Sequence, residues 1–548
     1  RSIPPWSDRY LADIAVITMA TGKTRRLTSE LRPLGFDVSP DGKYVASLSF
    51  AGMESPKAQQ PLYDLYLVPL QGEPPRRLAQ DVRQDYGVSI SWSPDSSYLA
   101  YRTHGQLARG DVFVVSIPNG SLQNLTKSVE AKLGHSYERP LWSADGKHLF
   151  CAAAGNLWQV SLDSSPARNL TEDFDKRVKG AVHPSERYTI WSPDGGRSVC
   201  VQTVDPESKQ HGFHQINLTN GKITRLLEES KWYGSFGITR FHMDVADDGK
   251  SVAYIAEDAT HPEDIWLLDG SFQSRKQITK LNPQLRNVAF GETRLISWQT
   301  SKGKRLQGVL LMPTDYVPGQ RYPLITRVYG GSSRSNRINH FGLEHAADDN
   351  MQLLATCGYA VFMPDAPLEV GNPLQQLAEL VLPGIDKVME LDIADAERLG
   401  LMGYSYGGYC VNCLITQTTR FRAAVSSAGT SDLVSMYGSP GENGDSRWTG
   451  WTESGQGRMG GTLWEFPERY VENSPVFLLD KVETPLLLIH GVEDVVPIAQ
   501  AEEMFSGLRR LGKRVSLVRY SDTGHGYWSY DNVVDYWKRI IAWFDEHL

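Results

Sequence analysis

The sequence predicts two domains of different fold class, an N-terminal β-propeller over residues 1–287 and an α/β domain over residues 288–548. Three observations lead to this prediction. A turn sequence recurs about every fifty residues in the first half, alternating strand patterns follow its copies, and the second half alternates short apolar runs with segments of helical period. A chain of 548 residues is long enough for each domain to bury its own core.

The recurring turn has the form Ser-Pro-Asp-Gly, and its copies lie at residues 39–42, 93–95, 143–146, 192–195 and 247–249. Proline presets the backbone angle of the second turn residue and glycine relieves strain at the fourth, so each copy predicts a tight β-turn. An alternating strand and a strand that ends in threonine follow, for example residues 111–117 and 124–126. Four short strands per repeat indicate antiparallel propeller blades, with an ordinary β-sandwich as the alternative.

The first repeat differs from the others, because residues 13–17 and 26–28 match the second half of a unit with no turn sequence before them. We therefore expect the chain to start in mid-blade, and upstream residues to be absent from this sequence.

The second half contains seven apolar runs that we interpret as strands, at residues 309–312, 324–329, 359–363, 399–403, 423–427, 486–490 and 515–520. Segments with helical period lie between or after them, at residues 374–391, 499–511 and 533–548. This alternation predicts a mostly parallel sheet with helices on both faces.

Composition excludes several classes of protein. The chain has 41% hydrophobic residues but no apolar run near the 18 residues of a membrane span, so membrane insertion is not expected. The net charge of −8, without a basic stripe, argues against a nucleic-acid partner. Five scattered cysteines imply no disulfide framework, and we interpret Cys410 and Cys413 as packing residues of a helix rather than a redox or metal pair. The compartment and the oligomeric state stay open.

The residues Gly403-Tyr404-Ser405-Tyr406-Gly407 match G-x-S-x-G between a predicted strand and a predicted helix. In this motif the serine occupies a sharp, strained turn that exposes its hydroxyl, and the glycines avoid clashes. Two later strands end in Gly491-Val492-Glu493-Asp494 and in Thr523-Gly524-His525-Gly526. The order serine, acid, histidine at successive strand ends is that of the α/β-hydrolase fold, which we predict for residues 288–548.

The combined pattern resembles the prolyl oligopeptidase family of serine peptidases, which includes dipeptidyl peptidases, acylaminoacyl peptidases and related bacterial enzymes. The resemblance covers the whole chain, and its motifs are residues 305–313, Tyr329-Gly330-Gly331, residues 403–409, Asn473-Ser474-Pro475, His490-Gly491 and Gly524-His525-Gly526. It implies hydrolysis of short or unfolded peptides through an acyl-enzyme, with a propeller that limits access and no cofactor or metal. Ser405 is the implied nucleophile, His525 the general base and then acid, and Asp494 the residue that orients the imidazole.

The oxyanion requires two hydrogen-bond donors. The geometry of the serine turn supplies the backbone N–H of Tyr406. Resemblance to the dipeptidyl-peptidase branch implies the Tyr329 hydroxyl as the second donor. It also implies a hydrophobic specificity pocket around Tyr437, Trp448 and Trp451, for which packing within a surface loop is the alternative.

Two departures from the family pattern matter. One residue is missing between His490-Gly491 and Val496-Pro497, so alignment on the first pair selects Asp494 as the acid and alignment on the second selects Glu493. We favour Asp494, because the strand end fixes the origin of the loop. The acidic pair that dipeptidyl peptidases use to hold a free N-terminus has no match, since we expect Glu228 and Glu229 to face solvent. The choice between endopeptidase and exopeptidase action, and the residue preferred at the cleaved bond, therefore stay open.

Some motifs and functions are less well supported. Residues 455–460 spell the dinucleotide-binding pattern G-x-G-x-x-G, but no strand precedes them and no βαβ unit holds them. No His or Cys cluster has metal-ligand spacing. Because the triad fixes acyl chemistry and not the leaving group, an esterase or an acyl-transferring peptide cyclase is an alternative function. A binding scaffold with an inactive hydrolase domain is a second alternative.

Overall fold

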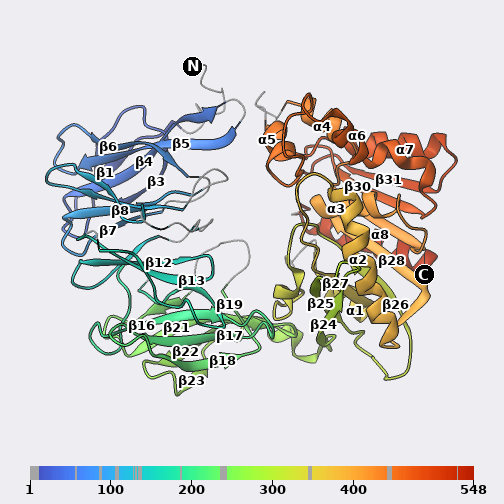
Figure 1. The fold of residues 1–548 in the computed structure, drawn as a ribbon, viewed down its shortest axis with the longest axis horizontal. Coiled ribbons are helices and arrows are strands. Elements are labelled where there is room, and N and C mark those ends of the chain that lie inside the picture. Colours follow the sequence, from blue (N-terminus) through green and yellow to red (C-terminus); the bar gives the residue numbers. More distant parts are fainter. Residues whose placement is uncertain are drawn as a thin grey trace. The chain divides into compact units, whose positions relative to one another are not determined.

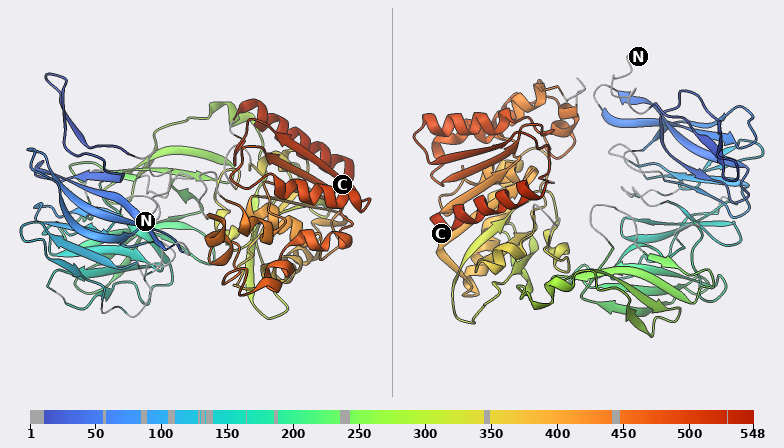
Figure 2. Two further views of the ribbon diagram at one scale, coloured as in Figure 1. Left: turned by 90° about the horizontal axis from the view of Figure 1, so that it is seen from above. Right: turned by 180° about the vertical axis from the view of Figure 1, so that it is seen from behind.

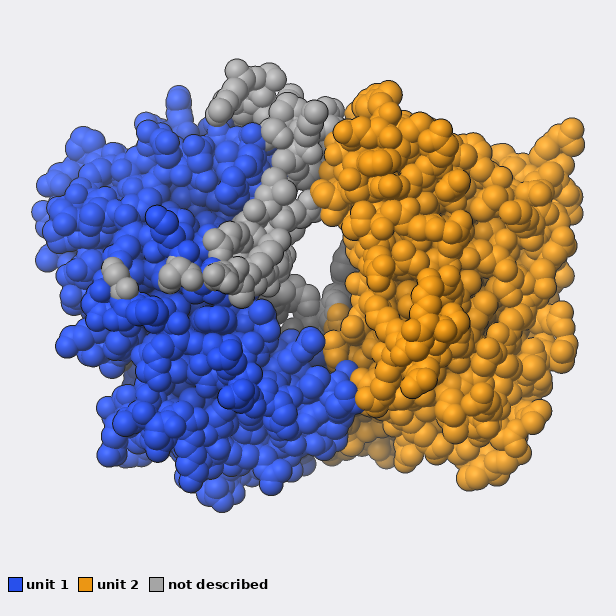
Figure 3. Space-filling view, in the orientation of Figure 1, with its two compact units in different colours: residues 1–256, 264–281 blue, residues 257–263, 282–548 orange. Residues whose placement is uncertain are grey.

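The computed structural model describes residues 11–55, 58–84, 89–104, 110–127, 129, 133, 139–163, 165–184, 188–234, 243–343, 349–440, 447–527 and 529–548. The chain divides into two compact units, which Figure 3 shows in different colours. Unit 1 comprises residues 1–256 and 264–281, and unit 2 comprises residues 257–263 and 282–548. The predicted domain boundary after residue 287 stays a prediction.

Unit 1 consists of successive antiparallel sheets, coloured blue to green in Figures 1 and 2. A two-stranded sheet contains β1 (Ala15–Thr18) and β2 (Lys23–Arg26). Three four-stranded sheets are formed by β3 (Pro33–Val38), β4 (Tyr44–Ser55), β5 (Ala58–Pro69) and β6 (Arg76–Arg83); by β7 (Ile90–Trp92), β8 (Tyr98–Arg102), β9 (Val112–Ser116) and β10 (Leu122–Asn124); and by β11 (Leu141–Trp142), β12 (His148–Ala153), β13 (Asn156–Ser161) and β14 (Arg168–Asn169).

Two further sheets complete unit 1 among the described residues. One contains β15 (Arg177–Ala181), β16 (Ser198–Val204), β17 (His211–Asn217) and β18 (Ile223–Glu229). The other contains β19 (Trp232–Tyr233), β20 (Met243–Val245), β21 (Ser251–Asp258), β22 (His261–Asp269) and β23 (Arg275–Gln277).

In each sheet of four or five strands, the recurring turn joins two neighbouring antiparallel strands, as predicted. In the first copy the N–H of Gly42 donates to the carbonyl of Ser39 (2.9 Å), and the Ser39 hydroxyl donates to Asp41 (2.7 Å). The threonine after the last strand has an equally local role. The Thr126 hydroxyl accepts from the N–H of Val112 (3.0 Å), and Thr171 and Thr279 repeat this contact in later sheets. The repeated sequence therefore encodes one repeated set of hydrogen bonds.

The expectation that Glu228 and Glu229 face solvent is wrong. Their side chains are only 13% and 12% exposed, because each carboxylate is held by a cation. Lys176 pairs with Glu228 (3.1 Å), and Arg275 pairs with Glu229, which also accepts a hydrogen bond from the Tyr233 hydroxyl (2.8 Å). The polar sequence of this strand suggested exposed carboxylates, but ion pairs with residues distant in the sequence keep both of them largely buried.

Unit 2 is built on one eight-stranded sheet with the strand order β24-β25-β27-β26-β28-β29-β30-β31. The first two pairings are antiparallel and all later ones are parallel. The strands are β24 (Thr293–Gln299), β25 (Arg305–Leu311), β26 (Tyr322–Arg327), β27 (Ala360–Pro364), β28 (Ala394–Tyr404), β29 (Ala423–Ser427), β30 (Leu486–Gly491) and β31 (Val515–Tyr520). Every strand predicted in this half is present, and β24 is an additional one.

Helices cover both faces of this sheet (Figure 1). They are α1 (Gln352–Thr356), α2 (Pro373–Glu390), α3 (Tyr406–Leu414), α4 (Leu433–Gly438), α5 (Arg447–Glu453), α6 (Pro467–Glu472), α7 (Ala499–Arg510) and α8 (Tyr530–His547), with 3₁₀ turns η2 (Pro283–Asn287), η3 (Arg334–Arg337) and η4 (Pro475–Lys481). Successive strand residues alternate between two cores: Leu488 packs with α2, α3 and α7, whereas Ile489 packs with α1 and α8. None of the described helices is both long and apolar enough to cross a membrane.

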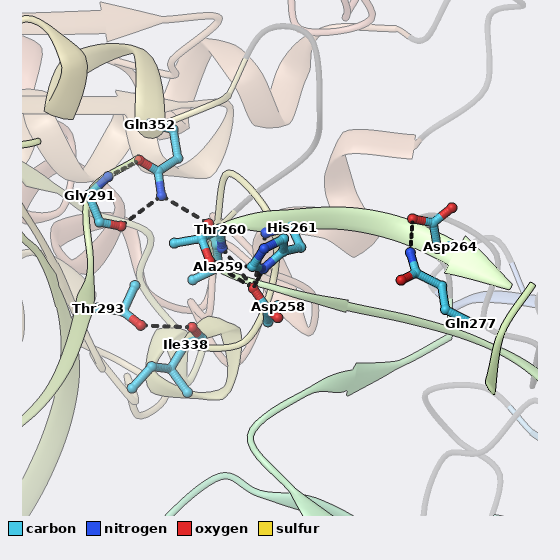
Figure 4. Close-up of polar contacts among 10 residues, drawn as sticks. All are labelled: Asp258, Ala259, Thr260, His261, Asp264, Gln277, Gly291, Thr293, Ile338 and Gln352. Carbon is cyan, nitrogen blue, oxygen red and sulfur yellow. Dashed lines mark hydrogen bonds and ion pairs between the residues drawn. The ribbon is translucent and has the colours of Figure 1, made fainter. Parts of the chain in front are cut away.

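The turn between β21 and β22 is counted with unit 2, and Figure 4 shows its polar contacts. The Gln352 amide donates to the carbonyls of Ala259 (2.9 Å) and Gly291 (3.0 Å) and accepts from the N–H of Gly291 (2.9 Å). Beside it, the buried Glu257 carboxyl lies 2.6 Å from the Nδ1 of the buried His340. Burial raises the pKa of Glu257 to about 8.

Candidate active site

Ser405 occupies the sharp turn between β28 and α3. Its backbone angles, φ 57° and ψ −122°, are sparsely populated by residues other than glycine and cost about 1–3 kcal/mol. The flanking glycines are needed because main chain lies directly against them. A Cβ on Gly403 would lie 2.1 Å from the carbonyl oxygen of Gly407, and one on Gly407 would lie 2.5 Å from the carbonyl oxygen of Val328. The motif therefore has the strained, close-packed form that its sequence predicts.

The structure brings three of the predicted residues into one hydrogen-bonded chain. The Oγ of Ser405 lies 2.9 Å from Nε2 of His525, and the Nδ1 of the same ring lies 2.7 Å from Oδ1 of Asp494. These distances suit proton transfer between serine and imidazole and orientation of the ring by the carboxylate. The neighbouring Glu493 has an exposed side chain. Asp494, and not Glu493, is the acid in contact with His525.

The Asp494 side chain is 1% exposed and is held by its own loop. Its Oδ1 accepts a hydrogen bond from the N–H of Val496 (2.8 Å), and Nε2 of His490 donates to the carbonyl of that residue (2.9 Å). Burial lowers the pKa of His490, so its ring stays neutral near pH 7. The neutral His490 ring, with its proton on Nε2, thus holds the Val496 main chain, whose N–H in turn holds the Asp494 carboxylate next to His525.

Gly491, at the end of β30, brings the acid and the histidine together. A Cβ at this position would lie 2.2 Å from the carbonyl oxygen of Thr523 and 2.5 Å from that of Gly524. The main chain before His525 thus passes directly over the end of β30. Because β30 and β31 pair in parallel, the segments that follow them leave the same edge of the sheet.

Of the two predicted oxyanion donors, Tyr406 directly follows the nucleophile in sequence, and Tyr329 lies near the Tyr406 ring. Tyr406 is the first residue of α3, so its backbone N–H belongs to the helix N-terminus, where donors have no partner within the helix. Tyr329 follows β26, and the centroid of its half-buried ring lies 6.0 Å from that of Tyr406. The Arg334 guanidinium lies over the Tyr329 ring, 4.4 Å from its centroid.

The three residues predicted for a specificity pocket have different surroundings. Trp451 is half-buried and packs edge-on against the Tyr406 ring, with centroids 6.1 Å apart. Trp448 is buried with Met436 in a small apolar cluster. Tyr437 is 6% exposed, and its hydroxyl donates to Glu453 (2.8 Å). Burial and this carboxylate raise the pKa of Tyr437. Trp451 thus lies beside Tyr406, whereas the Tyr437 hydroxyl is hydrogen-bonded to Glu453. The substrate-binding roles of the three residues stay predictions.

Gln456 is a site residue that sequence reasoning missed. Its Nε2 lies 3.0 Å from the Tyr329 hydroxyl, and its Oε1 accepts from the Trp451 indole (3.3 Å). It lies in the G-x-G-x-x-G segment, whose glycines have a packing role. A Cβ on Gly455 or Gly457 would meet the end of α5 at 2.8 Å and 2.6 Å. No local signal identifies Gln456, because its partner Tyr329 is 127 positions away.

The cysteine pair of α3 is buried, and both thiols are free. Cys410 accepts a hydrogen bond from the N–H of Gly330 (3.2 Å), and burial raises its pKa to about 12, which disfavours the reactive thiolate. In the described part of the chain, no group of three or more His, Cys, Asp or Glu side chains is arranged to hold a metal ion.

Comparison with known proteins connects this geometry to a family. Residues 375–548, which contain Ser405, Asp494 and His525, match the model of the prolyl oligopeptidase family. Over these residues the chain is therefore similar to the prolyl oligopeptidase family. The residue motifs that suggested the resemblance therefore identified the family correctly.

Relatives extend the similarity into the first half. The uncharacterized peptidase YuxL of Bacillus subtilis is 26% identical over 420 residues, which are 72% of this chain and 60% of the relative. Dipeptidyl-peptidase 5 of Porphyromonas gingivalis is 22% identical over 488 residues, 84% of this chain and 66% of the relative. The matched regions thus span 60–66% of the length of these two relatives. A solved puromycin-hydrolyzing peptidase of Mycobacterium tuberculosis has the same fold, with a TM-score of 0.71 at 18% identity over 98% of this chain and 83% of that one.

Proposed function

We propose that this chain is a serine peptidase that hydrolyses short or unfolded peptides through an acyl-enzyme on Ser405. One observation carries the proposal: Ser405, His525 and Asp494 form a continuous hydrogen-bonded chain within the segment that matches a peptidase family. The matched relatives that are named as peptidases support the choice of peptide substrates.

The chemistry follows from the distances. His525 Nε2, 2.9 Å from Oγ, takes the serine proton as Oγ attacks the substrate carbonyl. Asp494 keeps the imidazole in the tautomer that accepts this proton and stabilises the imidazolium that forms. The backbone N–H of Tyr406 and the Tyr329 hydroxyl donate to the oxyanion. His525 then gives the proton to the leaving amine, and water releases the acyl group by the reverse sequence.

We also infer that the sheets of residues 1–287 are the blades of a β-propeller and that the α/β-hydrolase domain begins at residue 288. The support is the repetition of one antiparallel sheet with one turn sequence and one threonine contact. In such a two-domain peptidase, the propeller restricts the substrates to short or unfolded chains.

An organophosphonate probe tests the function. The parent protein is expected to be labelled at Ser405 and to cleave members of a mixed peptide library, and Ser405→Ala is expected to lose both. Ser435→Ala is the matched control, since that serine lies in the same domain and outside the triad. Labelling of another serine, or turnover by Ser405→Ala, contradicts the proposal. Mass spectrometry of the products separates hydrolysis from cyclisation, and ester cleavage without peptide cleavage indicates an esterase.

A further inference from the structure

Gln456 connects two aromatic side chains next to the nucleophile. Tyr329 follows β26, Trp451 lies in α5, and the Gln456 amide bridges the phenol oxygen (3.0 Å) and the indole nitrogen (3.3 Å). The main chain around this amide is itself fixed. Arg458 donates to the Gln456 carbonyl (2.6 Å), and Gly457 packs so closely on Thr452 that a Cβ would lie 2.6 Å from its Cα. The amide is therefore held in place from several sides.

The orientation of the Gln456 amide follows from its partners. An indole N–H only donates, so the atom that faces Trp451 has to be the amide oxygen. The NH₂ group consequently faces Tyr329 and donates to the phenol oxygen. In this bond Tyr329 is the acceptor, and the bond leaves the phenol proton free for a different acceptor.

We propose that Gln456 is a positioning residue that orients the Tyr329 hydroxyl as a donor to the oxyanion. This inference rests on the proposed function, in which Tyr329 stabilises the tetrahedral intermediate. A phenol oxygen that accepts a hydrogen bond carries a more polarised O–H and donates more strongly. The Arg334 guanidinium over the ring favours the same polarisation and holds the ring from one face.

Replacing Gln456 by Glu separates this role from a packing role. The two side chains have nearly the same shape, but a carboxylate only accepts. It accepts the Tyr329 proton and turns the hydroxyl away from the oxyanion. We expect kcat to fall about 10²-fold, as for loss of an oxyanion donor, with little change in KM. Gln456→Leu removes the amide without capturing the proton, so its kcat is expected to fall only about tenfold. A packing role gives the opposite ranking, because leucine changes the shape more.

A double-mutant cycle with Tyr329→Phe provides the second readout. Both Gln456 variants are expected to change kcat little when the phenol is absent. Gln320→Glu, which adds the same charge on an exposed loop, is the control, and thermal unfolding is measured for each variant. If Gln456→Glu proves to be destabilised, the double-mutant cycle of Gln456→Leu with Tyr329→Phe decides whether Gln456 acts through Tyr329.

Three outcomes overturn the inference: equal kcat for Gln456→Glu and the parent, a larger loss for Leu than for Glu, or unchanged losses in the Tyr329→Phe background. Its failure is distinct from that of the proposed function. If Ser405→Ala abolishes turnover and Gln456→Glu does not alter it, only the positioning role is wrong. If Ser405→Ala retains turnover, the proposed function is wrong as well.

Discussion

Exchanging Asp494 for Asn removes the negative charge beside His525 and nearly preserves the shape of the side chain. Two donors converge on Oδ1, the N–H of Val496 at 2.8 Å and Nδ1 of His525 at 2.7 Å. An asparagine therefore keeps its oxygen, and not its NH₂ group, at this position. The imidazole keeps its proton on Nδ1, and Nε2 can still accept the Ser405 proton. The perturbation is thus mainly the loss of one charge.

The size of the effect follows from that charge. The imidazolium that forms during the reaction interacts with a carboxylate about 4 Å away by about 4 kcal/mol at an effective dielectric constant of about 20. Loss of this interaction in the transition state lowers kcat about 10³-fold. In a triad whose histidine also changes to the wrong tautomer, kcat falls by about 10⁴. We expect the smaller loss here, with KM nearly unchanged, because the carboxylate acts on the transition state.

The assay compares Asp494→Asn with Glu493→Gln, which removes the same charge from the exposed neighbour. We measure the rate of phosphonate labelling and kcat on the most readily cleaved peptide of the library, and we record thermal unfolding of both variants. Glu493→Gln is expected to stay within about tenfold of the parent. A larger loss for Glu493→Gln than for Asp494→Asn would refute the reasoning, as would a loss below tenfold for a folded Asp494→Asn.

Two further predictions concern stability. Ser405→Gly is expected to be more stable than Ser405→Ala by about 1 kcal/mol, since both lack the hydroxyl but only glycine adopts φ 57° without strain; equal unfolding temperatures in calorimetry contradict this. Burial raises the pKa of Glu257 from 4.5 to about 8. Between these two pH values the Glu257 carboxyl keeps its proton in the folded chain and has lost it in the unfolded chain. The free energy of unfolding should therefore fall as the pH rises through that range, by at most about 1.4 kcal/mol per pH unit, and Glu257→Gln should flatten this slope, whereas the exposed control Glu292→Gln should not. Identical slopes for Glu257→Gln and the parent in denaturant titrations would show that Glu257 does not titrate in this way.

Local patterns predicted much of the fold because their physical causes are local. The Asp41 turn and the Thr126 contact each involve hydrogen bonds within about fifteen positions, so they are visible in the sequence and recur with it. The runs at β29 and β31 were predicted with the residues that the structure gives them. The strand β24 was missed, although Ile296 and Trp298 alternate with less buried residues.

Contacts between distant segments could not be predicted in the same way. The exposure of Glu229 depends on Arg275, and the place of Gln456 depends on Tyr329, so neither follows from a local pattern. Sequence spacing alone also left two possible acids, because a one-residue deletion shifts the alignment. In the loop after β30, the Asp494 side chain is buried against His525 and the neighbouring Glu493 side chain is exposed.

The spacing of the candidate triad is set by main-chain contacts before any polar side chain is considered. Gly403 lets α3 begin directly against the end of β28, and Gly491 lets the segment before His525 cross the end of β30. Each approach is too close for a Cβ, so the three functional groups leave strand ends whose separation the sheet already fixes. The strain at Ser405 can then be maintained, because the surrounding backbone has little freedom to relax it. The hydrogen bonds among Ser405, His525 and Asp494 are a consequence of that backbone arrangement, which is why glycines identify this site in the sequence as clearly as the reactive residues do.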